Sequence, residues 1–241
     1  MDARPRATDA PRRSPVHRLC AAAGARFAPC GDAMLAVDYG APEAERDAAR
    51  RLGLCDLSVL PRAGFKGAGT RDWLASRDVA LPAAPNLAAR QPDGALAAAL
   101  GPEEILVLTD IAGRSTLAAR LHEAWHSGAG AGGRRGYPVP RGDTHAWFRV
   151  SGERAAAMFA KLAAVDLRPR KFGEGRVAQT SIARSAGIVI RNDGGAVPAY
   201  ELLVEWAMAD YYVPVLLDAM AEFDGRLVGQ RALVGLEDGA G

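Results

Sequence analysis

The sequence predicts an α+β fold in which two similar half-domains pack around one shared core. Each half of the chain reads as a strand, a glycine, a helix, a proline-containing loop, a hairpin and a second helix. The segments 102–108 (PEEILVL) and 199–205 (AYELLVE) occupy the same place in the two halves. Internal repetition of this kind is typical of two α+β units with a pseudo-two-fold relation.

The first half-domain is predicted to span residues 15–126. Acidic residues near the start of segment 42–52 and arginines near its end suit the dipole of a helix. The segments on either side of Gly101-Pro102 are predicted to pair as a hairpin, whereas the two prolines within residues 81–86 favour a loop. The expected helices of this half are residues 16–25, 42–52, 70–76 and 115–125, and the expected strands are 54–58, 63–67, 96–100 and 105–108.

The second half-domain is predicted to span residues 137–241, after a linker at 127–136 that contains five glycines. An expected strand at 146–151 and a helix at 153–164 lead through a loop to a hairpin. Its strands are predicted at 179–190, which is rich in β-branched residues, and at 200–205, with Asn192-Asp193-Gly194-Gly195 as the turn. Apolar residues spaced three and four apart then predict a helix over residues 211–220.

The composition is that of an ordinary globular protein. The 241 residues are 49% hydrophobic and 24% charged, and a net charge of +2 gives no strong field for nucleic acid or a membrane surface. No apolar run approaches the roughly 20 residues that span a bilayer. Residues 1–14 are basic and proline-rich without the apolar core of a secretory signal, so we expect a disordered tail. The three cysteines have no zinc or disulfide spacing, which favours a cytoplasmic location.

Motifs that would indicate independent catalysis are weak or missing. The string His122-Glu123-Ala124-Trp125-His126 matches the zinc-protease motif, but no third ligand is evident and the glycine-rich linker follows. We therefore predict an exposed helix end and no metal site. The glycine-rich run lacks the Gly-Lys-Ser/Thr ending of a phosphate loop, and no serine lies in a Gly-x-Ser-x-Gly elbow.

One arginine and one glutamate share the second hairpin. Arg184 lies in the first predicted strand and Glu201 in the second, and residues of adjacent antiparallel strands can face each other. Two interpretations stay open at this point: the residues belong to a binding site, or they form a structural ion pair.

Several short motifs resemble the glycine-cleavage T-protein (aminomethyltransferase) superfamily. The N-terminal resemblance runs from Pro15-Val16-His17 to Gly53-Leu54-Cys55-Asp56-Leu57-Ser58. Near the other end, Tyr200-Glu201 and Gly229-Gln230-Arg231-Ala232-Leu233 with Glu237 are similar to the folate-domain run of that superfamily. The resemblance covers residues 15–238 and leaves no room for the C-terminal barrel of the full-length enzymes.

Within the superfamily, the sequence is most similar to the gamma subunit of heterotetrameric sarcosine oxidase. Three features carry this closer resemblance, and their order adds to their weight. They are Leu81-Pro82 with Pro85-Asn86, then Leu100-Gly101-Pro102-Glu103-Glu104, then Gln179-Thr180-Ser181-Ile182-Ala183-Arg184 with the long helix from Ala209.

The resemblance implies a central tetrahydrofolate cleft that has lost its catalytic groups. Active T-proteins use paired aspartates in the first hairpin and an asparagine after the next strand. Here the first hairpin begins with Asp93-Gly94-Ala95, and the strand end reads Leu108-Thr109-Asp110. Without that charge the one-carbon chemistry is not supported, so we assign no catalytic residue. A vestigial folate cleft is expected at four residues: Glu201, Arg231, Tyr200 and Arg184.

The resemblance also implies partners. The expected function is that of a non-catalytic gamma-type subunit in a flavoprotein complex that oxidatively demethylates sarcosine or a similar amine. FAD, FMN and NAD are then expected in larger alpha and beta chains, beside a small delta chain, with tetrahydrofolate as the one-carbon acceptor. The chain itself has no Gly-x-Gly-x-x-Gly motif after a strand. The alternative is a stand-alone tetrahydrofolate-binding one-carbon enzyme that uses Glu201 and Arg231.

Overall fold

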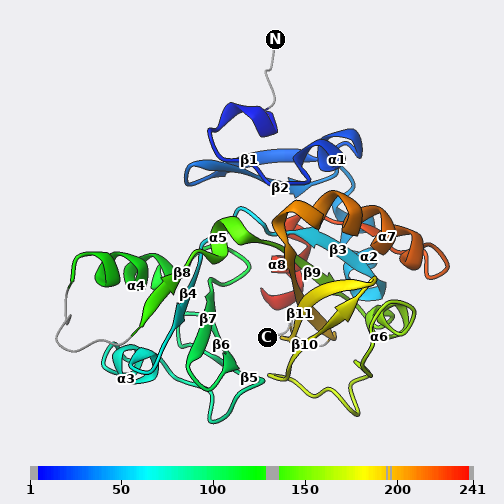
Figure 1. The fold of residues 1–241 in the computed structure, drawn as a ribbon. Helices are drawn as coiled ribbons and strands as arrows, with labels where there is room; N and C mark the ends of the chain where they lie inside the picture. Colours follow the sequence, from blue (N-terminus) through cyan, green and yellow to red (C-terminus); the bar gives the residue numbers. More distant parts are fainter. Residues whose placement is uncertain (1–4, 129–135, 194, 196, 239–241) are drawn as a thin grey trace.

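Two β-sheets face each other and are covered by helices on their outer sides (Figure 1). The structure is a computed structural model that describes residues 5–128, 136–193, 195 and 197–238. In these residues the strands form a two-stranded, a six-stranded and a five-stranded sheet. The expected α+β class with the T-protein type of fold is confirmed. Most of the predicted linker, residues 129–135, lies outside the described residues.

The five-stranded sheet belongs mostly to the first half of the chain. Its strands in spatial order are β5 (Leu87–Arg90), β6 (Leu96–Gly101), β7 (Glu104–Leu108), β4 (Arg62–Lys66) and β8 (Tyr137–Val139). Helices α3 (Thr70–Ala75) and α4 (Leu117–His126) cover its outer face. Phe65, Trp73 and Trp125 pack there ring against ring, with centroids 4.7–5.5 Å apart.

The six-stranded sheet belongs mostly to the second half. Its spatial order is β10 (Val177–Ile182), β11 (Ser185–Arg191), β12 (Ala199–Glu205), β9 (His145–Ser151), β3 (Gly53–Asp56) and β13 (Arg226–Leu227). Within this sheet the described β13–β3 pair is parallel, and the other strand pairs are antiparallel. Helices α6 (Ala155–Phe159) and α7 (Ala209–Ala221) lie on the outer face, and their apolar side chains join one buried cluster with Phe148, Val150 and Leu202.

The predicted repetition is present in the strand order. The order β5-β6-β7-β4 matches β10-β11-β12-β9, and in each half the fourth strand of this order comes first in sequence. The strand that precedes each repeat pairs with the other half: β3 pairs with β9, and β8 pairs with β4. The halves therefore exchange one strand each, a long-range pairing that local sequence patterns do not encode.

The second hairpin differs from its prediction. The sequence predicts one strand over residues 179–190, but Ala183 and Arg184 form a tight turn between β10 and β11, with φ of 48° and 67°. Two successive positive φ angles are typical of a type I′ hairpin turn, which usually contains Asn or Gly. Neither residue type is present, so the residues themselves carry no turn signal here. The predicted helix 153–164 is also shorter, ending at Phe159 in α6.

The N-terminal residues pack on the body of the protein. Residues 1–4 lie outside the described residues, but from residue 5 the predicted tail contains the 3₁₀ helix η1 (Ala7–Asp9). Arg12 donates to the carbonyl oxygen of Val59 over 2.7 Å, and Ser14 donates to the buried Asp56. These contacts hold the segment against the chain instead of leaving it disordered. It is followed by α1 (His17–Ala22) and by the hairpin β1 (Arg26–Cys30) and β2 (Ala33–Asp38), which was not predicted.

The C-terminal helix α8 (Gln230–Asp238) packs on α2 (Pro42–Arg51) and β2. Gly229 allows this approach, because a Cβ atom there would lie 2.3 Å from the backbone of Val37. The Gly229 N–H donates to the buried Glu45 carboxylate over 2.8 Å. The close approach directs α8 toward the space between the two large sheets and brings Glu237 to their edge.

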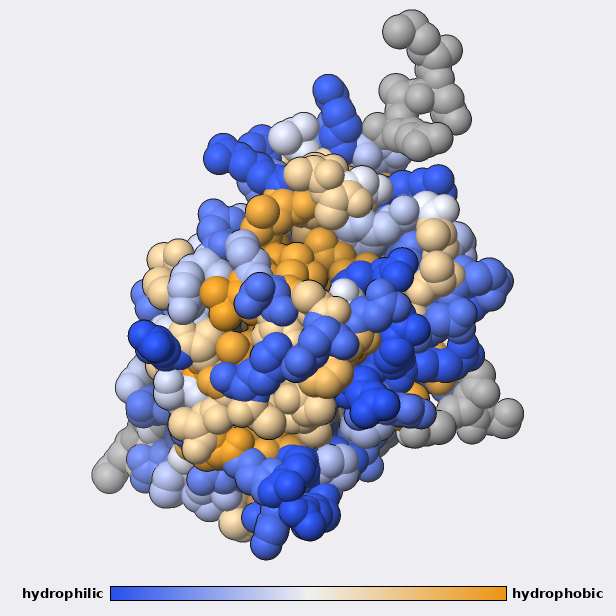
Figure 2. All heavy atoms as spheres, turned by 90° about the vertical axis from the view of Figure 1, so that its right-hand side faces the viewer, coloured by the Kyte–Doolittle hydropathy of each residue, from blue (hydrophilic) through white to orange (hydrophobic). Residues whose placement is uncertain are grey.

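The space between the sheets is filled by a second apolar cluster. Its members alternate along the strands and point inward, as the period of two requires. They include Leu96, Ala98, Leu106 and Leu108 from one sheet, and Trp147, Val177, Ile188, Ile190 and Leu203 from the other. Figure 2 shows the molecule from the side on which α6 and α7 lie in Figure 1, and apolar surface gathers in the middle of this face. No helix among the described residues is long and apolar enough to cross a bilayer.

Candidate functional site

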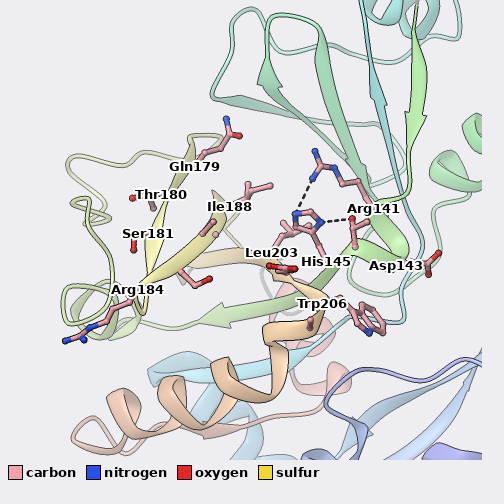
Figure 3. A pocket seen from close by; sticks show the side chains of 16 residues that line it. Arg141, Asp143, His145, Gln179, Thr180, Ser181, Arg184, Ile188, Leu203 and Trp206 are labelled. Carbon is pink, nitrogen blue, oxygen red and sulfur yellow. Dashed lines mark hydrogen bonds between the residues drawn. The ribbon is translucent and has the colours of Figure 1, made fainter.

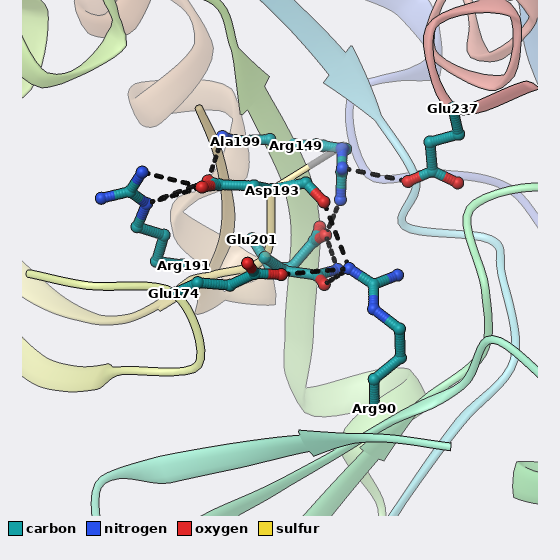
Figure 4. A network of polar contacts seen from close by, with 9 residues as sticks. Arg90, Arg149, Glu174, Arg191, Asp193, Ala199, Glu201 and Glu237 are labelled. Carbon is teal, nitrogen blue, oxygen red and sulfur yellow. Dashed lines mark hydrogen bonds and ion pairs between the residues drawn. The ribbon is translucent and has the colours of Figure 1, made fainter. Parts of the chain in front are cut away.

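A buried ion pair lies at one end of the space between the sheets (Figure 4). Arg149 of β9 and Glu201 of β12 are direct partners in the antiparallel register, and both project toward the facing sheet. The Arg149 side chain is 1% exposed and the Glu201 side chain 0%, and Arg149 Nη1 donates to Glu201 Oε1. A charge in this position needs a partner, because burial of an isolated ion costs several kcal/mol.

The remaining hydrogen-bonding capacity of Glu201 is also engaged. Trp147 Nε1 donates to Glu201 Oε2 over 2.8 Å, and Asn192 Nδ2 donates to Oε1 over 2.8 Å. Both carboxylate oxygens therefore have protein donors. Glu201 is therefore held by three donors from within the chain.

Arg149 connects this pair to the C-terminal helix. Its Nη2 donates to Glu237 Oε1 over 3.2 Å. Burial raises the pKa of the Glu237 carboxyl, and the nearby Arg149 opposes that rise. Arg90 of β5 donates to Asn192 Oδ1 over 2.6 Å and lies 3.7 Å from Glu174. Residues of both halves and of α8 thus form one polar cluster.

Three cavities adjoin this cluster, with volumes of about 180, 280 and 370 Å³, and Arg90 lines all of them. The lining of the smallest includes Asp93, Asp110 and Glu237. Pockets that hold drug-sized ligands are usually about 300–1,000 Å³. Asp93 is engaged by Ser115 Oγ over 2.7 Å and by the Ala95 N–H over 3.2 Å, so it shapes the loop at the start of the first hairpin.

The structure does not bring the four predicted site residues together. Glu201 lies in the polar cluster, but Tyr200 is its neighbour in β12 and points to the opposite face of the sheet. There Tyr200 packs on Phe159 and Phe172, and its hydroxyl donates to the Leu167 carbonyl over 2.8 Å. Burial raises the Tyr200 pKa to about 12.

The two predicted arginines lie elsewhere. Arg231 of α8 has a side chain that is 67% exposed, and it donates to Asp38 over 3.0 Å. Arg184 lies in the exposed β10–β11 turn. Glu201 forms an ion pair with Arg149 and not with Arg184. The two residues of the second hairpin therefore do not face each other, because the turn at Ala183 takes Arg184 to the far end of the sheet.

Three residues of the cluster, Arg149, Trp147 and Asn192, were missed in the sequence. A signal for the first exists: residues 146–150 (AWFRV) are apolar at every position except Arg149, so a charge there is expected to be buried and to need a partner. The Asn192 contact has no such signal, because Asn192 begins an Asn-Asp-Gly-Gly segment that predicts only a turn.

A much larger groove opens at the other end of the sheet, with a volume of about 1020 Å³ (Figure 3). We call it the β10–α5 groove, because β10 and the short helix α5 (Arg141–Thr144) lie on its two sides. Ile188 and Leu203 form its apolar floor, and Trp206 stands at its margin. Of the four predicted site residues, only Arg184 lines this groove.

His145 on the α5 side of the groove is neutral near pH 7. Burial, together with the nearby Arg141 and Arg62, lowers its pKa from 6.5 to about 4. Arg141 Nη1 donates to His145 Nε2 over 3.3 Å, which leaves Nδ1 to donate to Thr144 Oγ1 over 2.8 Å. The Arg141 guanidinium also pairs with Glu104 of β7 and so links α5 to the five-stranded sheet.

The rings of His122 and His126 in α4 are tilted by 39° with centroids 4.2 Å apart, and His126 Nδ1 bonds to the His122 carbonyl oxygen. Among the described residues, no group of three or more His, Cys, Asp or Glu side chains is arranged to hold a metal ion.

Comparison with solved structures identifies the fold. A chain of the heterotetrameric sarcosine oxidase from Corynebacterium sp. U-96, solved with pyrrole 2-carboxylate, matches with a TM-score of 0.65 and 22% identity. The match covers 89% of this chain and 97% of that chain. The resemblance predicted from the sequence is confirmed at the level of the fold.

The aminomethyltransferase T of the glycine cleavage system from Bartonella henselae matches with a TM-score of 0.70 and 16% identity. That match covers 92% of this chain but 61% of the aminomethyltransferase, so this chain spans less than two thirds of that protein. No protein-family model matches the sequence, and no curated protein matches it.

Proposed function

We propose that this chain is a non-catalytic, gamma-type subunit of a heteromeric flavoprotein complex of the sarcosine oxidase type. The observation that carries the proposal is the extent of the match. Nearly all of a sarcosine oxidase chain, 97%, is covered, whereas the aminomethyltransferase is covered over 61%. The match to nearly the whole of a chain from a heterotetramer supports a subunit role.

The interior of the fold supports the non-catalytic part of the proposal. Glu201 is engaged by three donors from this chain, Arg149, Trp147 and Asn192, and the adjoining cavities have volumes of about 180, 280 and 370 Å³, at or below the low end for ligand pockets. Asp93 is bound to Ser115 and Ala95. A carboxylate that is already neutralised and hydrogen-bonded cannot stabilise a new positive charge without breaking those contacts. No catalytic step is therefore assigned to this chain.

The proposed complex supplies the chemistry through other chains. By resemblance, FAD, FMN and NAD belong to larger alpha and beta flavoprotein chains, a small delta chain completes the assembly, and tetrahydrofolate accepts the one-carbon unit outside this chain. The complex would work in the cytoplasm on sarcosine or a similar secondary amine. The contribution of this chain is then to hold the larger chains together.

Reconstitution tests this proposal. The flavoprotein chains encoded beside the gene are produced with and without this chain, and sarcosine-dependent hydrogen peroxide release is measured. We expect this chain to co-elute with the flavoproteins, and we expect the yield of active complex to fall at least ten-fold when it is left out. Full assembly and full activity without it would contradict the proposal.

A tetrahydrofolate-binding one-carbon enzyme is the second candidate. The specific observation in its favour is the TM-score of 0.70 to the aminomethyltransferase, against 0.65 to the sarcosine oxidase chain. Titration calorimetry with tetrahydrofolate separates the two candidates. Binding at micromolar concentration that is lost in Glu201→Gln favours the enzyme, whereas no heat up to millimolar concentration favours the subunit.

A further inference from the structure

We propose that the β10–α5 groove is the docking site for a helix of a partner chain, which lies on the inner face of the six-stranded sheet with a basic residue beside Glu205. This inference rests on the proposed subunit function and names the surface that carries it. The internal repeat of the fold supports it, because a helix of the chain itself covers the counterpart of this groove in the first half.

One glycine in each half sets the alignment of the two repeats. The Gly67 N–H, directly after β4, donates to the Glu103 carbonyl over 2.9 Å. The Gly152 N–H, directly after β9, donates to the Pro198 carbonyl over 2.8 Å. Both glycines have positive φ, of 121° and 112°. In this alignment β7 and β12 begin at the same position, which differs by two residues from the alignment expected from the sequence.

The groove then has a counterpart in the first half. Leu203 of β12 corresponds to Leu108 at the end of β7, and both belong to the apolar cluster between the sheets. Two residues further along, Glu205 corresponds to Asp110. Glu205 lines the β10–α5 groove, and Asp110 lines the smallest cavity of the polar cluster. The two spaces are therefore equivalent in the repeat, although their volumes are about 1020 and 180 Å³.

Helix α8 covers the space in the first half. Gln230 Nε2, in its first turn, donates to the Ile111 carbonyl over 3.0 Å. Glu237, in its last turn, lines the cavity, and Leu233 between them joins the apolar cluster. A helix with one apolar side is therefore the element that this fold uses at the equivalent position.

No described element of this chain covers the second half in the same way. Glu205 and Ala186 are exposed, although they adjoin the buried Ile188 and Leu203 of the floor. A sheet face with apolar residues is stable only when another element packs on it. An amphipathic helix laid in an apolar groove is a common mode of recognition between chains.

The size of the groove fits a short helix. Residues of β10, β11, β12 and β9 line it, and three strand spacings of roughly 4.8 Å make it about 14 Å wide. A helix rises 1.5 Å per residue, so about nine residues laid across the strands span this width. Helix α8 itself has nine residues.

The charges specify what the docked helix carries. In the first half, Asp110 lies 3.7 Å from Arg114 of the same half. Its counterpart Glu205 has no ion-pair partner among the described residues, and the nearby Arg141 is already paired with Glu104. A lysine or arginine of the partner helix would complement Glu205, while its apolar side chains cover the floor.

Site-specific crosslinking in the assembled complex tests the inference. A photoreactive diazirine amino acid replaces Ser181 in one variant and Ala207 in another, both of which line the groove. In a control it replaces Arg120, which is exposed on α4. Each variant is produced with the flavoprotein chains encoded beside the gene, irradiated and analysed by mass spectrometry.

We expect both groove positions to crosslink to one stretch of a single partner chain, at residues three or four apart as on one side of a helix. The Arg120 position should give no such product. Crosslinked residues that are two apart would indicate an extended segment, and crosslinks to a second copy of this chain would identify a different occupant. Either result overturns the assignment of a partner helix.

Charge reversal gives an independent readout. Glu205→Lys is expected to weaken binding of the partner chain roughly ten-fold, because like charges then meet in the groove. Glu123→Lys, at an exposed position of α4, is the matched control and should leave the affinity unchanged. A complex that assembles without a crosslink from either groove position, and that binds both charge variants equally well, overturns the groove assignment alone. Absence of any complex overturns the proposed function and the groove assignment together.

Discussion

Arg149 of β9 and Glu201 of β12 face each other across adjacent strands. Both side chains are buried between the two large sheets, at the end where the polar cluster lies. β9 is the first strand of the second repeat and β12 is its last. The ion pair lies where the sequence resemblance implies a folate cleft, and Arg149 also contacts Glu237 there. The pair and the contacts around it therefore have measurable consequences for stability and for binding.

Glu201→Ala should lower the free energy of unfolding by about 3–5 kcal/mol, because Arg149 then stays buried with Glu237 as its remaining carboxylate. Urea denaturation measures the change. Asp224→Ala is the control, since the Arg51–Asp224 pair is exposed and should contribute at most about 1 kcal/mol. A loss below about 1 kcal/mol for Glu201→Ala would mean that the pair is not buried as described.

Arg62→Lys should also destabilise the protein, by roughly 3 kcal/mol or more. The buried Arg62 guanidinium donates to five carbonyl oxygens, including those of Arg141, Gly142 and His145, and so joins β4 to α5. A lysine ammonium has three donors and cannot reproduce the planar fork. Arg120→Lys, at an exposed position, should leave the melting temperature unchanged, and equal melting temperatures for the two variants would refute this role of Arg62.

Tyr200→Phe should cost about 1–3 kcal/mol, because it leaves the Leu167 carbonyl without its buried donor. Tyr137→Phe is the matched control at a side chain that is 55% exposed. Urea denaturation measures both changes, and equal losses for Tyr200→Phe and Tyr137→Phe would contradict the buried contact with Leu167.

His145 should make stability depend on pH. Its pKa is about 4 in the folded protein and 6.5 in the unfolded reference, so the unfolded chain takes up a proton first. The contribution is complete above pH 6.5 and is lost as the pH falls toward 4. His145→Gln should flatten the fall in melting temperature over this window, whereas His126→Gln at the exposed end of α4 should not. An unchanged slope in His145→Gln would rule out the buried neutral imidazole.

The fold could be predicted from the sequence where local patterns carry the information. The Gly101-Pro102 hairpin, the helices around Trp73 and Tyr212, and the repetition of the halves all follow from turn chemistry and spacing. The exchange of β3 and β8 between the halves could not be predicted, since strand pairing depends on contacts far apart in the chain. The Ala183–Arg184 turn was hidden because its positive φ angles fall on residues that rarely adopt them.

The candidate site was predicted only in part. Glu201 was identified, but its partner lies 52 residues away in β9 and has no local signal that pairs the two. Tyr200 and Glu201 were grouped because they are adjacent in sequence, although neighbouring residues of a strand point to opposite faces. The period of two within a strand is therefore enough to assign these side chains to different sides of the sheet.

Native mass spectrometry of the co-produced chains tests the central claim most directly. We predict that this chain is found in one species with the flavoprotein chains, at a fixed stoichiometry, and that tetrahydrofolate adds no mass to the isolated chain. A free chain that stays alone beside an assembled flavoprotein complex, and that retains tetrahydrofolate, would contradict the proposed subunit function.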